Sequence, residues 1–402
     1  PKLFGMTALR IVLALSLACA ASAATIGDVR SASQPRLALG RASTKGSQLV
    51  ASPSDPQHKV RAVRGGGSSF DVPLLLYFVF WYIGNMFYNK YNTMALTAVG
   101  GKNSGLTMTV STLQLGVCTL YACLLWLTKI NPIKLFGGEK PEKMSLPKTT
   151  QADIVATVPV GFCAAAAHSA GVFCLGADPL FGQIVKAGEP VMSAFVNTVF
   201  YGKPPSLAKL FCLFFIVGGV GFASLKKDLA TGVYKLKFDE KALLFGMIGN
   251  SFAAFKGSEN KKLMTKPGLK DRMGGVANQF ALTEIMGFLI SVPVMVATEY
   301  KKFPEFFRIL ASSKDLQIGL LVSGLSFYLY NELATMTIKK TGAVTSSVAN
   351  TAKRVIVLVF MSAVTGKALT AEQKIGAAVA ISFVLLYALI DDLVAKVKAK
   401  YA

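Results

Sequence analysis

The chain has 402 residues, of which 52% are hydrophobic and only 16% are charged, and its mean hydropathy is +0.49. A soluble domain carries about a quarter charged residues, so this composition indicates a membrane protein and excludes a soluble enzyme with one unusual core helix. The 36 glycines and 16 prolines are too few and too scattered for a fibrous or disordered chain.

The basic residues exceed the acidic ones by 43 to 21, which gives a formal net charge of +22. We expect no nucleic-acid partner, because the basic residues lie mostly in short loops between apolar runs and in the N-terminal segment, as the positive-inside pattern requires. The six cysteines show no CxxC spacing. We therefore expect neither a disulfide framework nor a metal site.

The first 70 residues have the composition of a targeting segment. Residues 1–24 contain Arg10, an apolar run over 11–17 and small residues near 21–23, which is typical of a secretory signal peptide. Residues 25–70 hold seven basic residues against two acidic ones, with many Ser, Ala and Gly, as transit peptides do. The two together predict a bipartite address that leads through the secretory route into a plastid with extra membranes. The alternative is a flexible basic tail on a secretory-pathway protein.

Apolar stretches long enough to cross a bilayer follow from residue 74 onward, as a window of about 19 residues detects them. We predict an all-α membrane protein with ten transmembrane helices, which places both ends of the mature chain on one side. The predicted spans are 74–95, 105–128, 152–175, 179–200, 206–225, 242–263, 277–298, 316–337, 341–364 and 372–391.

An internal repeat relates the fourth predicted span to the ninth. Residues 189–206 and 353–370 each contain an apolar run, then Gly-Lys, then Ser or Thr three residues after the lysine. We therefore predict two five-helix halves, 71–225 and 226–402. Because five is odd, the halves would have opposite orientations, as in many secondary transporters whose substrate site lies between the repeats. Chance similarity of two apolar helices is the alternative.

Charged residues inside the predicted spans need a reason, since a charge at the bilayer centre costs about 2.5 to 3.5 kcal/mol on insertion scales. Lys353 and Arg354 are adjacent in an otherwise apolar span, and Lys186 lies in the repeat-related span. A planar guanidinium and two ammonium groups suit a phosphate dianion, so these three cations predict a phosphate clamp.

Each of these cations also has a purely structural interpretation. Lys186 would pair with Glu189, Lys353 would pair with Glu332 or Glu284 across helices, and Lys256 would pair with Glu259 within its own helix. All these acids lie in the predicted spans.

Four segments together resemble one known family. They are VKAGEP at 185–190, FYLYNELA at 327–334, the Asn89-Lys90 step, and NTAKRV at 350–355 followed by a Gly-Lys loop. Residues 70–395 resemble the plastidic phosphate translocators of the drug/metabolite transporter superfamily. Within that group the chain is most similar to the triose-phosphate/phosphate translocators, which exchange inorganic phosphate for triose phosphates or 3-phosphoglycerate across the inner plastid membrane.

The resemblance implies roles for six residues. Lys186, Lys353 and Arg354 match the phosphate ligands of the family, and the hydroxyl of Tyr330 would also reach the substrate. His168 would contact the far end of the substrate, if one residue is deleted between it and Lys186. Lys256 stands where the family has an arginine. The alternatives are a helix-packing role for His168 and an ordinary buried tyrosine at position 330.

The sequence therefore predicts a multi-pass antiporter of the inner plastid envelope, without cofactor, metal or catalytic residues, and monomeric or homodimeric in the lipid bilayer. Its substrates would be inorganic phosphate and phosphorylated C3 compounds. The alternatives are a phosphoenolpyruvate, pentose-phosphate or hexose-phosphate exchanger, and a nucleotide-sugar carrier of the secretory pathway. A membrane enzyme is disfavoured, because the chain has two histidines and no catalytic constellation.

Overall fold

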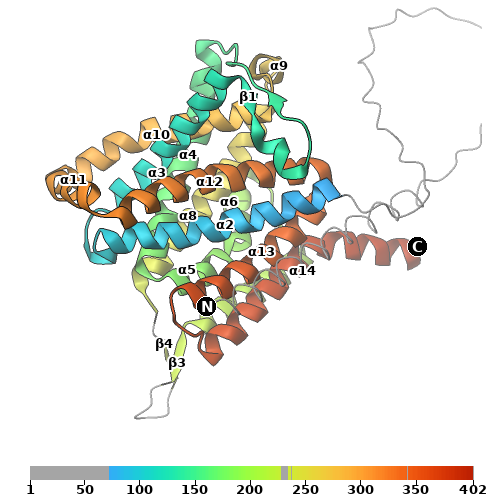
Figure 1. The fold of residues 1–402 in the computed structure, drawn as a ribbon. Coiled ribbons are helices and arrows are strands. Elements are labelled where there is room, and N and C mark those ends of the chain that lie inside the picture. Colours follow the sequence, from blue (N-terminus) through green and yellow to red (C-terminus); the bar gives the residue numbers. More distant parts are fainter. Residues whose placement is uncertain (1–71, 228–233, 237, 342, 402) are drawn as a thin grey trace, which may run out of the picture.

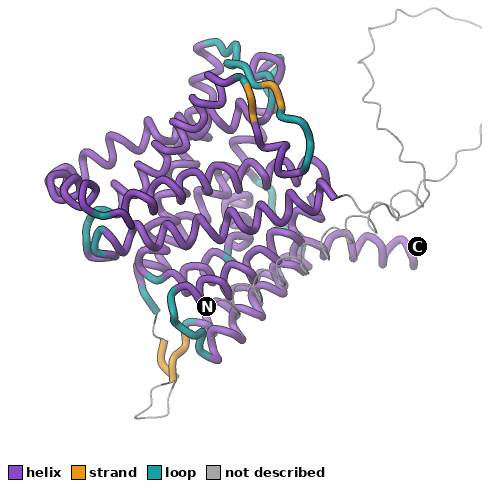
Figure 2. The backbone as a smooth tube through the Cα atoms, viewed as in Figure 1, coloured by secondary structure: helices purple, strands orange, loops and turns teal. Residues whose placement is uncertain are grey.

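The computed structural model describes residues 72–401 except 228–233, 237 and 342. The predicted leader segments 1–24 and 25–70 therefore lie outside the described residues. Most of the described part is helical, and two short antiparallel strand pairs lie far apart on the bundle (Figure 2). This arrangement agrees with the all-α class predicted from the sequence.

The long helices cross one another in a single bundle (Figure 1). In chain order they are α2 Val72–Ala98, α3 Thr107–Thr128, α4 Gln151–Ala177, α5 Pro179–Lys186, α6 Glu189–Tyr201, α7 Leu207–Ala223, α8 Glu240–Met264, α10 Val276–Glu299, α11 Phe303–Ser312, α12 Lys314–Thr341, α13 Ala343–Val364 and α14 Ala371–Tyr401. The short elements are η1 Gly101–Asn103, β1 Ile130–Asn131, η2 Pro132–Gly137, β2 Glu142–Lys143, β3 Leu225–Lys227, β4 Tyr234–Leu236, α9 Leu269–Met273 and η3 Tyr300–Lys302.

Each strand pair closes a connection between helices. The strand β1 pairs with β2, with Ile130 opposite Lys143, and β3 pairs with β4, with Lys226 opposite Lys235. Two- and three-residue strands cannot form a core of their own. They link the chain segments on either side of each connection, and the helices supply the hydrophobic core.

Four helical segments in the described part are long and apolar enough to cross a membrane: Thr107–Thr128, Gln151–Ala177, Val276–Ser312, which joins α10, η3 and α11, and Ala371–Asp391 of α14. Large apolar side chains on the bundle surface, such as Leu127 and Phe214, are more than 70% exposed, as lipid contact requires. The chain is an all-α membrane protein. The count of ten spans and the division at residue 225 stay predictions.

The predicted fourth span, 179–200, is not one continuous helix. It is divided into α5 and α6, with Ala187 and Gly188 between them. The cause is Pro190, which has no backbone N–H and whose ring would clash with the carbonyl four residues earlier in a continuous helix. That carbonyl belongs to Lys186. The sequence therefore frees a backbone oxygen next to a residue of the predicted phosphate clamp.

The ends of several helices are bound by side chains from distant segments. Glu299, at the end of α10, accepts hydrogen bonds from the backbone N–H groups of Met108 and Thr109, at 2.9 and 2.7 Å. Arg272 donates two hydrogen bonds of 2.7 Å to Asp153 in the first turn of α4. A carboxylate at a helix N-terminus satisfies unpaired N–H groups and the positive end of the helix dipole. These contacts link the start of α3 to the end of α10 and the start of α4 to α9.

The loops at the two copies of the internal repeat have the same local geometry. Gly202 and Gly366 both adopt left-handed backbone, with φ of 62° and 65°. Four residues later, Ser206 and Thr370 each accept a hydrogen bond from the backbone N–H three positions ahead, at 3.3 and 3.2 Å. A left-handed glycine ends one helix and a hydroxyl cap begins the next. The predicted inverted repeat has its structural support in this shared loop geometry, and it stays a prediction.

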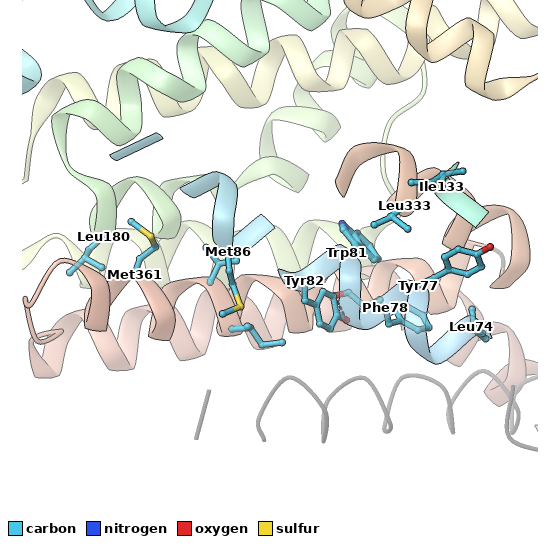
Figure 3. Close-up of a cluster of buried hydrophobic side chains, with 13 residues drawn as sticks. Leu74, Tyr77, Phe78, Trp81, Tyr82, Met86, Ile133, Leu180, Leu333 and Met361 are labelled. Carbon is cyan, nitrogen blue, oxygen red and sulfur yellow. Dashed lines mark hydrogen bonds between the residues drawn. The ribbon is translucent and has the colours of Figure 1, made fainter. Parts of the chain in front are cut away.

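Three helix pairs, α2 with α12, α4 with α8, and α7 with α14, form the most extensive contacts of the bundle. A cluster along α2 that includes Tyr77, Phe78 and Trp81 packs against α12 and α13 through Leu333 and Met361 (Figure 3). Glycines allow the closest approaches, and a Cβ atom at Gly219 would lie 2.7 Å from the backbone of Ala380. Small residues at such crossings are the usual means of helix packing in membranes.

Replacing Gly219 by Leu is expected to separate α7 from α14 and to destabilise the protein by about 1–3 kcal/mol, the usual cost of overpacking. The measurement is the thermal unfolding midpoint of the purified protein in detergent. Gly218→Leu is the matched control, because a side chain at Gly218 would meet nothing within 4 Å. Equal midpoints for the two variants would contradict this account of the crossing.

Candidate functional site

A cavity of about 260 Å³ lies in the bundle, lined by residues of α2, α4, α5, α6, α8, α12 and α13. All six residues singled out in the sequence line it: His168, Lys186, Lys256, Tyr330, Lys353 and Arg354. They come from five different helices. The fold thus brings together side chains that are up to 186 positions apart in the sequence, from His168 to Arg354.

Arg354 is held at the break between α5 and α6. Its Nη1 donates to the backbone carbonyl of Lys186 at 2.5 Å, and its Nη2 donates to Oε2 of Glu189 at 2.5 Å. The carbonyl is the one that Pro190 leaves without a helical partner, and C-terminal carbonyls attract cations. Arg354 is 15% exposed, so this guanidinium is fixed in position and largely desolvated.

Glu189 forms an ion pair with Arg354 rather than with Lys186. The structural alternative for Lys186 was a pair with Glu189, three positions along a continuous helix. That pair is absent because the helix is broken between the two residues, and Glu189 turns to α13 instead. Within the described residues, Lys186 forms no ion pair.

Lys353 contacts aromatic rings rather than acids. Its Nζ lies 5.3 Å from the ring centroid of Trp81 and 5.9 Å from that of Tyr330, within the range of cation–π attraction. The expected alternative, an ion pair with Glu332 or Glu284, is not formed among the described residues, and Glu332 accepts a 2.5 Å hydrogen bond from Asn131 instead. The ammonium group of Lys353 is therefore available to an anion in the cavity.

Two glycines determine how closely the lining residues approach. A Cβ atom at Gly171 of α4 would lie 3.2 Å from Nζ of Lys186, so any side chain there would displace that ammonium group. A Cβ atom at Gly84 of α2 would lie 3.0 Å from Cβ of Tyr330. Because both positions lack a side chain, Lys186 of α5 can lie close to α4, and Tyr330 of α12 can lie close to α2.

His168 is 5% exposed, and neither of its ring nitrogens has a hydrogen-bond partner among the described residues. Its ring packs against Phe327, with centroids 4.3 Å apart, and more distantly against Tyr88. The alternative interpretation, a packing histidine that donates to a backbone carbonyl, stays open, since the backbone of Ser111 on α3 lies near the imidazole. A buried imidazole on a cavity wall can also donate to or accept from a ligand.

Lys256 also lines the cavity without the predicted intrahelical partner. Glu259 accepts hydrogen bonds from Lys262 at 2.8 Å and from the hydroxyl of Tyr201 at 2.6 Å. The carboxylate of Glu259 is thus directed toward α6 and the end of α8, away from Lys256. The structural interpretation of Lys256 as half of a pair with Glu259 is wrong.

The sequence interpretation missed a polar chain on α2. The amide of Asn89 donates to the backbone oxygen of Asn85 at 2.7 Å, and Gln183 of α5 donates to Oδ1 of Asn89 at 2.6 Å. All three line the cavity, whereas Lys90, which the family motif paired with Asn89, is exposed. The sequence pattern that could have indicated this polar chain is an amide residue in each turn of an apolar span, where an unsatisfied polar group is costly.

Comparison with known proteins identifies the family of this chain. A sequence model described as the Triose-phosphate Transporter family matches residues 72–388. The chain belongs to the triose-phosphate transporter family. Members of this family are transporters, and the resemblance to plastidic phosphate translocators that the motifs predicted is confirmed.

The relatives of this chain are named after different substrates. Phosphoenolpyruvate/phosphate translocator 3, chloroplastic, of Oryza sativa subsp. japonica is 26% identical over 366 residues, covering 88% of this chain and 84% of the relative. Glucose-6-phosphate/phosphate translocator 2 of Arabidopsis thaliana is 24% identical, covering 78% and 74%. The triose phosphate/phosphate translocator of Flaveria trinervia is 27% identical over a shorter part, 61% of this chain and 59% of the relative.

The cavity is suited to an anion. Four cationic side chains and one carboxylate line it, and amide, phenol and imidazole groups surround them. Fixed cations at low dielectric attract an anion strongly because little solvent must reorganise around them. The six residues are brought together as predicted, and their roles in binding stay predictions.

Proposed function

We propose that this protein is an antiporter that exchanges inorganic phosphate for triose phosphate or 3-phosphoglycerate across the inner envelope membrane of a plastid. The observation that carries the proposal is the convergence of Lys186, Lys353 and Arg354 on one cavity. Membership of the triose-phosphate transporter family supports exchange with phosphate. The phosphate group would lie between the two ammonium groups and the guanidinium fork.

The far end of the substrate would lie toward His168 and Lys256, on α4 and α8. Tyr330, which packs between Tyr88 and Phe327 with both ring centroids 5.7 Å away, would donate its hydroxyl to the substrate. An imidazole and an ammonium group together suit a hydroxyl, carbonyl or carboxylate. These groups would therefore discriminate between phosphate esters.

The alternative substrates are phosphoenolpyruvate, pentose phosphates and hexose phosphates, two of which appear in the names of relatives. A nucleotide-sugar carrier is less well supported, because the cavity of about 260 Å³ lies below the usual range of about 300–1,000 Å³ for drug-sized ligands. The predicted bipartite leader favours a complex plastid reached through the secretory route. Microscopy of a fluorescent fusion tests that location.

Alternating access would use the broken helix. When phosphate enters, its oxygens compete with Glu189 for Arg354 and take over the neutralisation of this guanidinium. Discontinuous helices at the midplane are a recurrent device of secondary transporters, because helix ends offer backbone groups to the substrate. The site then reopens on the other side of the membrane.

The decisive experiment is counter-exchange in proteoliposomes. Vesicles loaded with phosphate should take up labelled phosphate, triose phosphate and 3-phosphoglycerate much faster than vesicles loaded with sulfate. Competition with phosphoenolpyruvate, glucose 6-phosphate and a nucleotide sugar ranks the alternatives. Absence of phosphate-for-phosphate exchange in well-incorporated protein would contradict the proposed function.

A further inference from the structure

The carboxyl end of α5, just before the helix break, is held by two side chains from distant helices. The carbonyl of Lys186 accepts from Arg354 of α13, and the carbonyl of Val185 accepts a 3.0 Å hydrogen bond from Nδ2 of Asn250 on α8. The last carbonyls of a helix have no partner further along it, so donors from outside determine where the helix end lies. Arg354 belongs to the predicted phosphate clamp, whereas Asn250 has no assigned role.

Asn250 is 6% exposed and lies where α8 packs closely against α5. One turn earlier on α8, a Cβ atom at Gly246 would lie 2.5 Å from Cγ1 of Val185. The helix α8 therefore contacts both the side chain and the carbonyl of Val185. Any side chain at Gly246 would push the two helices apart and break the hydrogen bond of Asn250.

A second cavity, of about 290 Å³, lies between the helix break, α7 and α8, and Asn250 lines this cavity as well as the central one. Its wall is otherwise mostly apolar, with residues such as Val185 and Met192. The other polar side chain in this wall, Ser224, donates to the carbonyl of Val220 in its own helix, at 2.9 Å. The described lining of this cavity thus offers no substitute for the amide of Asn250.

The position of the α5 end determines where the ammonium group of Lys186 lies, because Lys186 is the last residue of this helix. Its Nζ lies against Gly171 of α4, and α4 and α8 form one of the most extensive contacts of the bundle. The end of α5 therefore rests on a packed pair of helices. Since Lys186 forms no ion pair within the described residues, the placement of α5 directs its ammonium group, and no acid does.

Asn250 and Arg354 differ in how a substrate affects them. The guanidinium of Arg354 is itself a predicted phosphate ligand, so a bound anion competes for its hydrogen bonds. The amide of Asn250 is neutral and can hold the carbonyl of Val185 with or without a bound anion. Without this amide the end of α5 would occupy several positions, and only the fraction with Lys186 at the phosphate site would bind well.

We propose that Asn250 is a positioning residue for Lys186. Its amide holds the end of α5 so that the ammonium group of Lys186 lies at the phosphate site. Asn250 thereby determines the affinity for the phosphate group, which all the proposed substrates share. This inference rests on the proposed function, because Lys186 is a phosphate ligand in that proposal.

Asn250→Leu is the test, because leucine is similar in size to asparagine and has no donor. In proteoliposomes the half-saturating concentration should rise roughly three- to tenfold, as the loss of one neutral hydrogen bond allows. The factor should be the same for phosphate and for 3-phosphoglycerate, and the maximal rate should change by less than about twofold. Asn250→Ser, whose hydroxyl is one atom too short for the carbonyl, should show the same rise if the leucine variant does not fold.

Asn278→Leu is the matched control. Asn278 is 4% exposed, and its Nδ2 donates to the backbone carbonyls of Ser145 and Met273 at 2.9 and 2.8 Å, but it does not line the central cavity. This variant should lower the unfolding midpoint in detergent and leave the half-saturating concentration unchanged. Titrating the midpoint of Asn250→Leu with phosphate repeats the affinity measurement without transport.

Three results would overturn the inference. They are unchanged half-saturating concentrations in the Asn250 variants, an equal rise in Asn278→Leu, and a rise confined to 3-phosphoglycerate. The last result would mean that Asn250 contacts the rest of the substrate and does not act through Lys186. Absence of phosphate exchange by the unmodified protein would instead contradict the proposed function.

Discussion

Replacing Lys353 by Gln is expected to abolish phosphate exchange while leaving the protein at least as stable as before. Lys353 has no acidic partner among the described residues, so its removal breaks no ion pair and relieves repulsion from Arg354. A charge-assisted contact contributes about 1.5–3 kcal/mol, so losing the ammonium group should weaken phosphate binding by roughly ten- to a hundredfold. Exchange rates in proteoliposomes and unfolding midpoints in detergent test the two parts separately.

Arg354→Gln should differ from Lys353→Gln in its stability. It removes the partner of Glu189 and a donor to the Lys186 carbonyl, so both exchange and stability should fall. Arg354→Lys should recover part of the stability but little exchange, because a point charge cannot make two directed hydrogen bonds at once. Normal exchange by Lys353→Gln would remove this residue from the phosphate site.

The cationic residues of the site were predictable because a charge in an apolar span has few structural explanations. Lys186, Lys353 and Arg354 stand out in the sequence for this reason, and all three line the cavity. Tyr330 and His168 could not be found this way, since buried tyrosine and histidine are common in any helix bundle. They came from the family resemblance, and the structure places both on the cavity wall.

The partners of these charges were not predictable. Glu189 and Arg354 are 165 positions apart, and which acid meets which base depends on helix packing that no local pattern encodes. Every pair suggested from the sequence, Lys186 with Glu189, Lys256 with Glu259 and Lys353 with Glu332 or Glu284, is absent among the described residues. The local pairs fail because Glu189, beyond the helix break, binds Arg354, and because Lys262 and Tyr201 bind Glu259.

The break in the fourth span was predictable in principle. Hydropathy is continuous from residue 179 to 200, and a window of about 19 residues averages over the interruption. The signal was the Gly188-Glu189-Pro190 step, since glycine before an acid and a proline is a typical helix start. Reading this step as a helix N-terminus would have placed Glu189 and the free Lys186 carbonyl at the site.

Replacing Glu189 by Gln is expected to tighten phosphate binding and to strengthen the coupling of exchange. Glu189 competes with the substrate for Arg354, so its neutral analogue should lower the half-saturating phosphate concentration by roughly tenfold, the value of one charge-assisted hydrogen bond. Release should slow for the same reason. Initial rates at varied phosphate concentration in proteoliposomes measure both effects.

The coupling argument follows from the charges that face one another when no substrate is bound. Two like charges about 6 Å apart repel by about 3 kcal/mol at an effective dielectric of about 20, which opposes closure of a cavity that contains no anion. Glu189 offsets one of the cations, so it partly substitutes for the substrate. With Gln at this position the offset is lost, and return of the carrier without substrate becomes less favourable still.

The measurable quantity is the ratio of phosphate uptake into phosphate-loaded vesicles to uptake into vesicles without internal substrate. We expect a high ratio for the unmodified protein and a higher one for Glu189→Gln. Glu189→Asp, which keeps the charge on a shorter side chain, should fall between them, and Glu259→Gln should leave the ratio unchanged, because Glu259 is bound to Lys262 and Tyr201. A lower ratio in Glu189→Gln would mean that Glu189 restrains return without substrate rather than assisting it, and the repulsion among Lys186, Lys353 and Arg354 would then not be what enforces exchange.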